Sequence, residues 1–251
     1  MTSDDPLPRQ TKRMQPRQRV MRLTPQSLSR RTLFIASNLA IVAGAQTVKP
    51  ADAVAKVDLA LVSDFVGKAH RPDVEALKAL LAQEPGLLNS AWDWGRGDWE
   101  TALGAASHTG QRDNASLLLD RGARPDLFAA TMLGELATVK SWLAFAPTAH
   151  QVPGPHGIPL LSHAVVGMKP ALPVFELLLE RGANVSAAAN NGMTPLMMAA
   201  LNGHADAVKA LLSAGADGRA TAKDGRTAFS MASKSGRDQV VKMLADSGIS
   251  Q

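Results

Sequence analysis

The stretch Thr194-Pro195-Leu196-Met197-Met198-Ala199-Ala200 is followed 33 positions later by Thr227-Ala228-Phe229-Ser230-Met231-Ala232-Ser233. The same offset of 33 recurs among the glycines, which align as Gly192 with Gly225, Gly203 with Gly236, and Gly182 with Gly215 and Gly248. A period kept by independent marker residues predicts a repeat array, because each small unit buries its apolar face only against its neighbours. We therefore expect most of the chain to form one stack of similar units.

Each unit carries the local signals of two helices joined by turns. Thr194 can cap a helix whose first residue is Pro195, and the pair Asn191-Gly192 suits a tight turn before it. Gly215 is placed to end the second helix in the left-handed conformation. In these features the sequence resembles the ankyrin repeat. The resemblance implies an all-α solenoid of helix-turn-helix units with short β-fingers, of a kind that binds other proteins.

About six such units can be followed along the chain. Residues 117–123 have a counterpart in residues 177–183, and residues 75–81 match residues 206–212 almost one for one. Gly110 and Gly134 are only 24 residues apart, so the third unit is expected to lack its β-finger. The predicted ankyrin-repeat domain covers residues 54–251, with units at about 58–88, 97–122, 126–148, 156–182, 191–215 and 224–248.

Residues 1–53 differ from the rest of the chain in charge. They contain nine basic and three acidic residues, whereas eighteen basic and nineteen acidic residues follow them. The net charge of +5 is therefore a property of this leader. Because a nearly neutral body releases few counterions on binding phosphates, we expect no nucleic-acid partner.

The leader has the parts of a secretory signal. A basic start leads into an apolar stretch over residues 33–45, which is too short to span a bilayer, and small residues follow it. The segment resembles a twin-arginine export signal, although Leu33 precedes the aromatic residue where the usual order is reversed. The motif residues are Ser29, Arg30, Arg31 and Phe34, and the candidate cleavage residues are Ala51 and Ala53.

This second resemblance implies where the protein acts. Residues 1–53 would be a disordered or helical signal peptide, handled by the twin-arginine export machinery and removed by signal peptidase near residue 53. The mature product would be a soluble periplasmic protein with no stable membrane anchor.

The sequence carries few signs of chemistry. The chain has no cysteine, which excludes disulfides, a thiol nucleophile and a Cys-ligated metal. Its six histidines are scattered without a metal-binding helical spacing, and His163 aligns with an alanine of the fifth unit and is expected in the core. No phosphate-binding loop, dinucleotide fingerprint or nucleophile elbow occurs in the sequence. We therefore expect no cofactor, no metal site, no catalytic residue and no enzymatic activity.

The strongest candidates for partner binding precede the helices of the second and fourth units. Trp92, Trp94 and Trp99 lie together, and tryptophan gives a large contact area with few rotatable bonds. The indoles could instead pack over the core of the first unit, and both interpretations stay open. His156 lies in a proline-rich segment that either presents it beside the tryptophans or serves as a plain connector.

In the later units, further candidates come from the resemblance alone. The finger and inner-helix positions that face a partner in ankyrin repeats correspond here to Asn190, Asn191, Met193, Met197, Lys223, Asp224 and Arg226.

The sequence favours a non-catalytic scaffold that is exported to the periplasm and binds a protein partner through the concave face of the array. Residues 92–106 and 154–161 look like those of exported bacterial ankyrin-repeat proteins. One alternative is an accessory or protective factor for an enzyme such as a catalase, as resemblance to periplasmic ankyrin proteins suggests. Another is a hydrolase or small-ligand binder with a site near Trp92, Trp94, Trp99 and His156.

Overall fold

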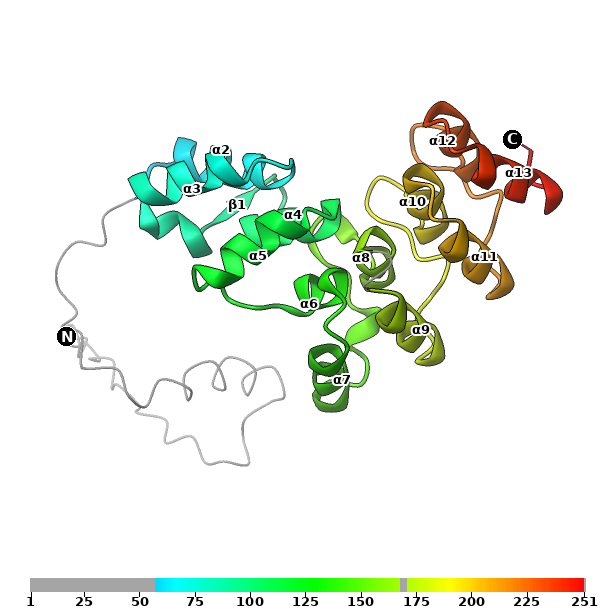
Figure 1. Ribbon diagram of the computed structural model, residues 1–251, viewed down its shortest axis with the longest axis horizontal. Helices are drawn as coiled ribbons and strands as arrows, with labels where there is room; N and C mark the ends of the chain where they lie inside the picture. Colours follow the sequence, from blue (N-terminus) through cyan, green and yellow to red (C-terminus); the bar gives the residue numbers. More distant parts are fainter. Residues whose placement is uncertain (1–56, 168–170, 251) are drawn as a thin grey trace, which may run out of the picture. The chain divides into compact units, whose positions relative to one another are not determined.

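The computed structural model describes residues 57–167 and 171–250 (Figure 1). The expected signal motif at Ser29, Arg30, Arg31 and Phe34, the apolar stretch and the cleavage residues Ala51 and Ala53 lie outside these ranges. No helix within the described ranges is long and apolar enough to cross a membrane. The described residues all belong to one compact unit, residues 55–251.

Twelve α-helices occur in the described residues, and they follow one another as six pairs. This mostly helical, paired arrangement agrees with the predicted fold class. The pairs are α2 Leu59–Ala69 with α3 Val74–Gln83, α4 Ala102–Thr109 with α5 Arg112–Asp120, α6 Leu127–Leu133 with α7 Leu136–Phe145, α8 Leu160–Gly167 with α9 Leu172–Glu180, α10 Pro195–Asn202 with α11 Ala205–Ser213, and α12 Ala228–Lys234 with α13 Asp238–Asp246.

Short elements connect the pairs. A hairpin of β1 Ala91–Asp93 and β2 Trp99–Thr101 precedes α4. The 3-10 turn η1 Pro85–Asn89 precedes the hairpin, and the turns η2 Ala149–Gln151 and η3 Pro155–Gly157 lie between α7 and α8.

The repeated threonines and glycines have a structural cause. The hydroxyls of Thr101, Thr194 and Thr227 each accept a hydrogen bond from the backbone N–H three residues on, which caps α4, α10 and α12. Gly110 and Gly203 end α4 and α10 in the left-handed conformation, with φ of 71° and 77°. The period of the sequence is thus the period of the helix caps.

The first helices of the pairs form the centre of the stack. Helices α2, α4, α6, α8, α10 and α12 contact one another in that order (Figure 1). Helix α6 lies between two apolar cores, since Ala129 and Met132 belong to one cluster and Leu127 and Ala130 to the other. The third pair therefore joins the two halves of the stack.

Polar side chains at the start of α5 fasten neighbouring pairs together. The guanidinium of Arg112 donates to the carbonyls of Met132 and Leu133 at the end of α6, at 2.7 and 2.9 Å. The buried amide of Asn114 donates to the carbonyl of Ala69, the last residue of α2, and to that of Arg71 just beyond the helix. Because the last carbonyls of a helix have no partner inside it, these bonds satisfy groups that stacking would otherwise bury unpaired.

The link into the third pair is short, as its spacing predicts. Residues 121–126 run from α5 to α6, and these six described residues contain no β-strand. Helix α4 consequently also contacts α8, the first helix of the fourth pair. Helix α8 packs directly on the backbone of α6 at Gly167. A Cβ added to this glycine would overlap the carbonyl oxygen of Met132, so only glycine fits there.

Substitution Gly167→Ala should therefore destabilise the stack. The added methyl group meets backbone rather than a movable side chain, so α6 and α8 must separate, at a cost of about 3 kcal/mol. For a domain of this size that cost lowers the melting temperature by roughly 6–12 °C. Thermal unfolding followed by circular dichroism measures the change.

The matched control is Gly67→Ala in α2, where an added Cβ meets nothing within 4 Å. Alanine has the higher helix propensity, so this variant should be unchanged or more stable by up to about 1 kcal/mol. Equal effects of the two substitutions would contradict the close packing of α6 on α8.

Candidate functional site

The hairpin before α4 supplies the central group of the candidate site. Its strands pair antiparallel with Trp92 opposite Glu100, and the turn from Gly95 to Gly97 is left-handed throughout. Side chains alternate along a strand, so Trp99 faces solvent whereas Glu100 faces inward. The fold therefore places a carboxylate in its interior.

Glu100 is 1% exposed and is surrounded by nitrogen atoms. The indole of Trp94 donates to its Oε2 at 2.8 Å. Nε2 of His70 lies 3.2 Å and Nε2 of His156 3.3 Å from the same oxygen, and Nδ1 of His108 lies 3.0 Å from Oε1. Three imidazoles thus converge on one buried carboxylate.

These three histidines come from different helix pairs. His70 is the C-terminal cap of α2, and its Nδ1 donates to the carbonyl of Val66 at 3.0 Å. His108 belongs to the last turn of α4, and His156 lies in the loop before α8. The cluster therefore depends on how the first, second and fourth pairs stack.

Asp98 holds His156 in an unusual conformation. The φ of His156 is 57°, in the left-handed region that costs a non-glycine residue roughly 1–2 kcal/mol. Asp98 accepts its backbone N–H at 2.8 Å and its Nδ1–H at 2.7 Å. The two hydrogen bonds offset the strain and aim Nε2 of His156 at Glu100.

Hydrogen bonds connect the loops that precede α4, α8, α10 and α12, each to the next. Among the described residues, the third pair contributes no loop to this chain of contacts. Asp98 of the hairpin binds His156, whose carbonyl accepts the N–H of Asn190 at 2.8 Å. The carbonyl of Asn191 in turn accepts the N–H of Lys223 at 2.9 Å. Because the third pair has no finger, the hairpin of the second pair meets the loop of the fourth directly.

The cluster is strongly coupled electrostatically. Burial alone would raise the pKa of Glu100, but the imidazoles of His108 and His70 close to its oxygens outweigh burial, so the pKa is well below its ordinary value. Burial also opposes the charged form of His70, yet the neighbouring Glu100 carboxylate raises the pKa of that imidazole overall. Slight burial opposes ionisation of Asp98, but its hydrogen bonds with His156 lower its pKa. Both carboxylates are therefore ionised at neutral pH.

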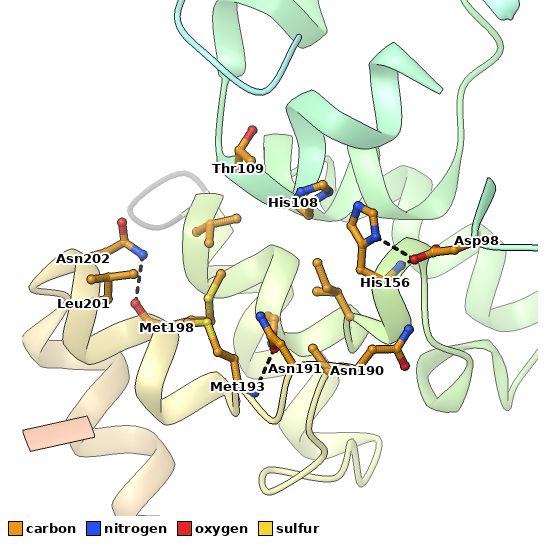
Figure 2. A pocket seen from close by; sticks show the side chains of 14 residues that line it. Asp98, His108, Thr109, His156, Asn190, Asn191, Met193, Met198, Leu201 and Asn202 are labelled. Carbon is orange, nitrogen blue, oxygen red and sulfur yellow. Dashed lines mark hydrogen bonds and ion pairs between the residues drawn. The ribbon is translucent and has the colours of Figure 1, made fainter. Parts of the chain in front are cut away.

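A pocket of about 670 Å³ adjoins the cluster. Asp98, His108 and His156 form one wall, and Figure 2 shows their side chains on the side opposite the loop and helix of the fifth pair. The facing wall combines amides and apolar side chains, namely Asn190, Asn191, Met193, Met198, Leu201 and Asn202.

The three candidate tryptophans have different surroundings. Trp92 is half-buried and packs against the core of the first pairs. Trp94 is 45% exposed and Trp99 61% exposed, but Trp94 also binds Glu100 and its ring centre lies 6.2 Å from that of His156. Trp92 therefore has a packing role, and Trp94 lies beside the histidines and binds Glu100. Trp99 is exposed to solvent and can contact a partner.

The candidate residues of the later units lie in different places. Asn190, Asn191 and Met193 line the pocket. Met197 does not face a partner: it is 1% exposed in the core, because it lies on the side of α10 turned toward the stack, and the next residue, Met198, lines the pocket instead.

A second group of candidates lies at the turn before α12, away from the pocket lining. The carboxylate of Asp224 pairs with the guanidinium of Arg226 at 2.6 Å on the exposed surface. Lys223 is exposed beside them, and its backbone N–H binds the loop of the fifth pair.

Four residues of the cluster, His70, Asp98, Glu100 and His108, were not predicted from the sequence. A signal exists in the repeat register, because His108 precedes Gly110 by two positions, as Leu201 precedes Gly203. His70 falls at the same register when residues 75–81 are aligned with residues 206–212. Neighbouring units thus carry histidine at one equivalent position, which stacking brings side by side, with ring centres 5.1 Å apart.

Comparison with known families matches only the last part of the chain. Residues 161–251, which hold the last three helix pairs, match the family model described as ankyrin repeats in three copies. No curated protein matches the chain. The cluster around Glu100 lies before the matched residues.

His163 in α8 lies apart from this cluster and is buried, as its alignment with alanine predicts. Its Nδ1 lies 3.1 Å from the carbonyl of Pro159, whereas Nε2 has no hydrogen-bond partner among the described residues. Burial lowers the pKa of His163 to about 3. The ring therefore stays neutral in the folded protein well below the pH at which a free histidine is protonated.

The folded state should consequently lose stability in acid through His163. Below pH 6.5 the unfolded chain binds a proton that the folded chain does not, so the free energy of unfolding falls as the pH falls toward 3. His163→Leu removes this contribution, which is about 1.4 kcal/mol per pH unit. Urea denaturation of both proteins at pH 6.5, 5.5 and 4.5 measures it, and parallel losses of stability would contradict the neutral, buried state of the ring.

Proposed function

We propose that the chain is an exported, non-catalytic scaffold that binds a protein partner through the loops and first helices of its stack. Ankyrin repeats are generally protein–protein interaction modules, and residues 161–251 match that family. The first three helix pairs continue the same alternation of helices, which supports an array of six units. The partner would meet a surface spread over several units.

The observation that carries this proposal is the pocket between the cluster and α10. Its volume of about 670 Å³ is enough for one or two side chains of a partner. Met193 and Met198 offer flexible, polarisable walls, and the amides of Asn190 and Asn191 can pair with a peptide backbone. Such a lining suits an apolar anchor residue carried on a polypeptide.

Placing a charge in this pocket should abolish binding. Met193→Glu puts a carboxylate against the apolar wall, and desolvating it should weaken partner binding by roughly tenfold or more. The native chain and the variant are each used to capture proteins from periplasmic extract, and affinities for a captured protein are then measured by calorimetry.

The control is Met243→Glu, which changes the same residue type at a similarly half-buried position in α13, outside the pocket lining. It should leave the affinity unchanged. Equal binding by all three proteins would place the partner on another surface and overturn the role of the pocket.

The same pocket supports a second candidate, a hydrolase or small-ligand binder, because Asp98, His108 and His156 form one of its walls. Assays of the purified protein with ester, glycoside and phosphate substrates distinguish this candidate from the scaffold. Turnover that disappears in His156→Ala would replace the scaffold proposal by an enzymatic one.

Export rests on the leader, and its test is independent of the pocket. The pair Arg30 and Arg31 would be read by the twin-arginine machinery, for which lysine is a poor substitute because it lacks the planar, forked guanidinium. The double substitution Arg30→Lys and Arg31→Lys should leave the full-length chain in the cytosol. Fractionation and immunoblotting of a bacterial host measure this, and a processed periplasmic product from the variant would contradict the proposed route.

A partner that is itself a periplasmic enzyme, such as a catalase, is the accessory-factor form of this proposal. It shares the docking surface and differs only in the partner that the capture experiment returns.

A further inference from the structure

We infer that His70, Glu100, His108 and His156 form a binding site for a divalent transition-metal cation of the Zn²⁺ type. One ligand atom of each residue lies within 4.8 Å of those of the other three. No two of these residues have a metal-binding spacing on one helix, because the ligands come from three helix pairs. The stacked fold creates the cluster.

The hydrogen bonds around the cluster leave lone pairs directed at its centre. The carbonyl of Val66 can only accept, so Nδ1 of His70 carries a proton and Nε2 of the neutral ring carries a lone pair. Oδ2 of Asp98 lies 2.7 Å from Nδ1 of His156 and accepts its proton in a hydrogen bond, which leaves Nε2 of His156 facing Glu100. Carboxylates and carbonyls behind metal-bound histidines have this orienting role.

Two buried atoms of the cluster lack a hydrogen bond. Nδ1 of His108 and Oε1 of Glu100 are 3.0 Å apart, but their mutual orientation is not that of a hydrogen bond, and neither finds another partner among the described residues. Buried polar atoms are otherwise almost always paired. A cation between the imidazoles and the carboxylate would satisfy both atoms at once.

The distances suit a four-coordinate ion. Ligands about 2.0–2.1 Å from a tetrahedral centre are roughly 3.3 Å apart, and the imidazole nitrogens lie 3.0 to 3.3 Å from the oxygens of Glu100. The wider spacings, up to 4.8 Å, must contract when an ion draws the rings inward. His70 and His156 are the more exposed rings, so they have the room to turn.

The donor set selects the class of metal. Three imidazole nitrogens and one carboxylate oxygen suit Zn²⁺, Co²⁺, Ni²⁺ or Cu²⁺, whereas Mg²⁺ and Ca²⁺ prefer oxygen ligands alone. The positive charge of a divalent ion would also compensate the buried carboxylate of Glu100.

A bound ion would act as a cross-link between distant parts of the array. It would join the end of α2, the hairpin and α4 of the second pair, and the loop before α8. The chain has no cysteine with which to make such a link covalently. Because the unfolded chain does not hold these four residues together, binding should stabilise the folded state.

The test uses the full chain with any affinity tag removed, and Zn²⁺ as the probe. Calorimetry should show one saturable site per chain. At a Zn²⁺ concentration about one hundred times the dissociation constant, the melting temperature should rise by roughly 5–10 °C. Mg²⁺ and Ca²⁺ at the same concentration should have no effect.

Variants then locate the site. His156→Ala removes one ligand from the half-buried loop before α8 and should weaken Zn²⁺ binding at least roughly a hundredfold, with loss of the thermal shift. The matched control is His204→Ala, which removes a half-buried histidine at the start of α11 outside the cluster and should bind Zn²⁺ like the native chain.

The visible spectrum of the Co²⁺-loaded native chain needs no variant. Four-coordinate cobalt with nitrogen and oxygen ligands absorbs far more strongly than the six-coordinate hydrated ion, so strong visible bands are expected. Weak hydrated-type bands, absence of saturable Zn²⁺ binding, or equal losses in His156→Ala and His204→Ala would each overturn the proposal. If His156→Ala fails to fold, the cobalt spectrum decides.

Discussion

The structure depends on the inability of a short helix pair to bury its own apolar face. Each first helix has seven to eleven residues, and side chains on both of its flanks need cover from the neighbouring pairs. Helix α6 shows this clearly, because Ala129 and Met132 serve one core while Leu127 and Ala130 serve the other. Each pair is therefore stable only when its neighbours are folded against it. The side chains of Arg112 and Asn114 donate hydrogen bonds to the helix-end carbonyls that this stacking buries.

A single local shortening reshapes the loop side of this stack. The third pair follows the second after only a brief link, so no finger separates the hairpin of the second pair from the loop of the fourth. Asp98 therefore contacts His156. The two hydrogen bonds between these residues stabilise the left-handed backbone of His156. The site around Glu100 is a consequence of that contact, since without it one of the three imidazoles would be missing.

The sequence predicted the local features better than the site. Helix caps such as Thr194 and turns such as Gly203 act through their immediate neighbours, so a repeat of 33 residues reveals them. Resemblance alone places Met197 on the partner-facing side, whereas in the folded stack it is buried in the core and the neighbouring Met198 lines the pocket. His70 and His156 are 86 residues apart, and only the packed first helices bring them together.

The buried charge of Glu100 is informative because the repeat does not require it. Counting back from the cap threonines, the equivalent residue is Met193 in the fifth unit and Arg226 in the sixth, so the finger forms with unrelated side chains at this register. An ionised carboxylate in the interior is costly unless charged or hydrogen-bonded partners compensate it, whereas an apolar side chain of similar size would not need them. Packing alone therefore does not account for a glutamate encircled by three histidines. The arrangement is better explained by a role in which the charge itself takes part.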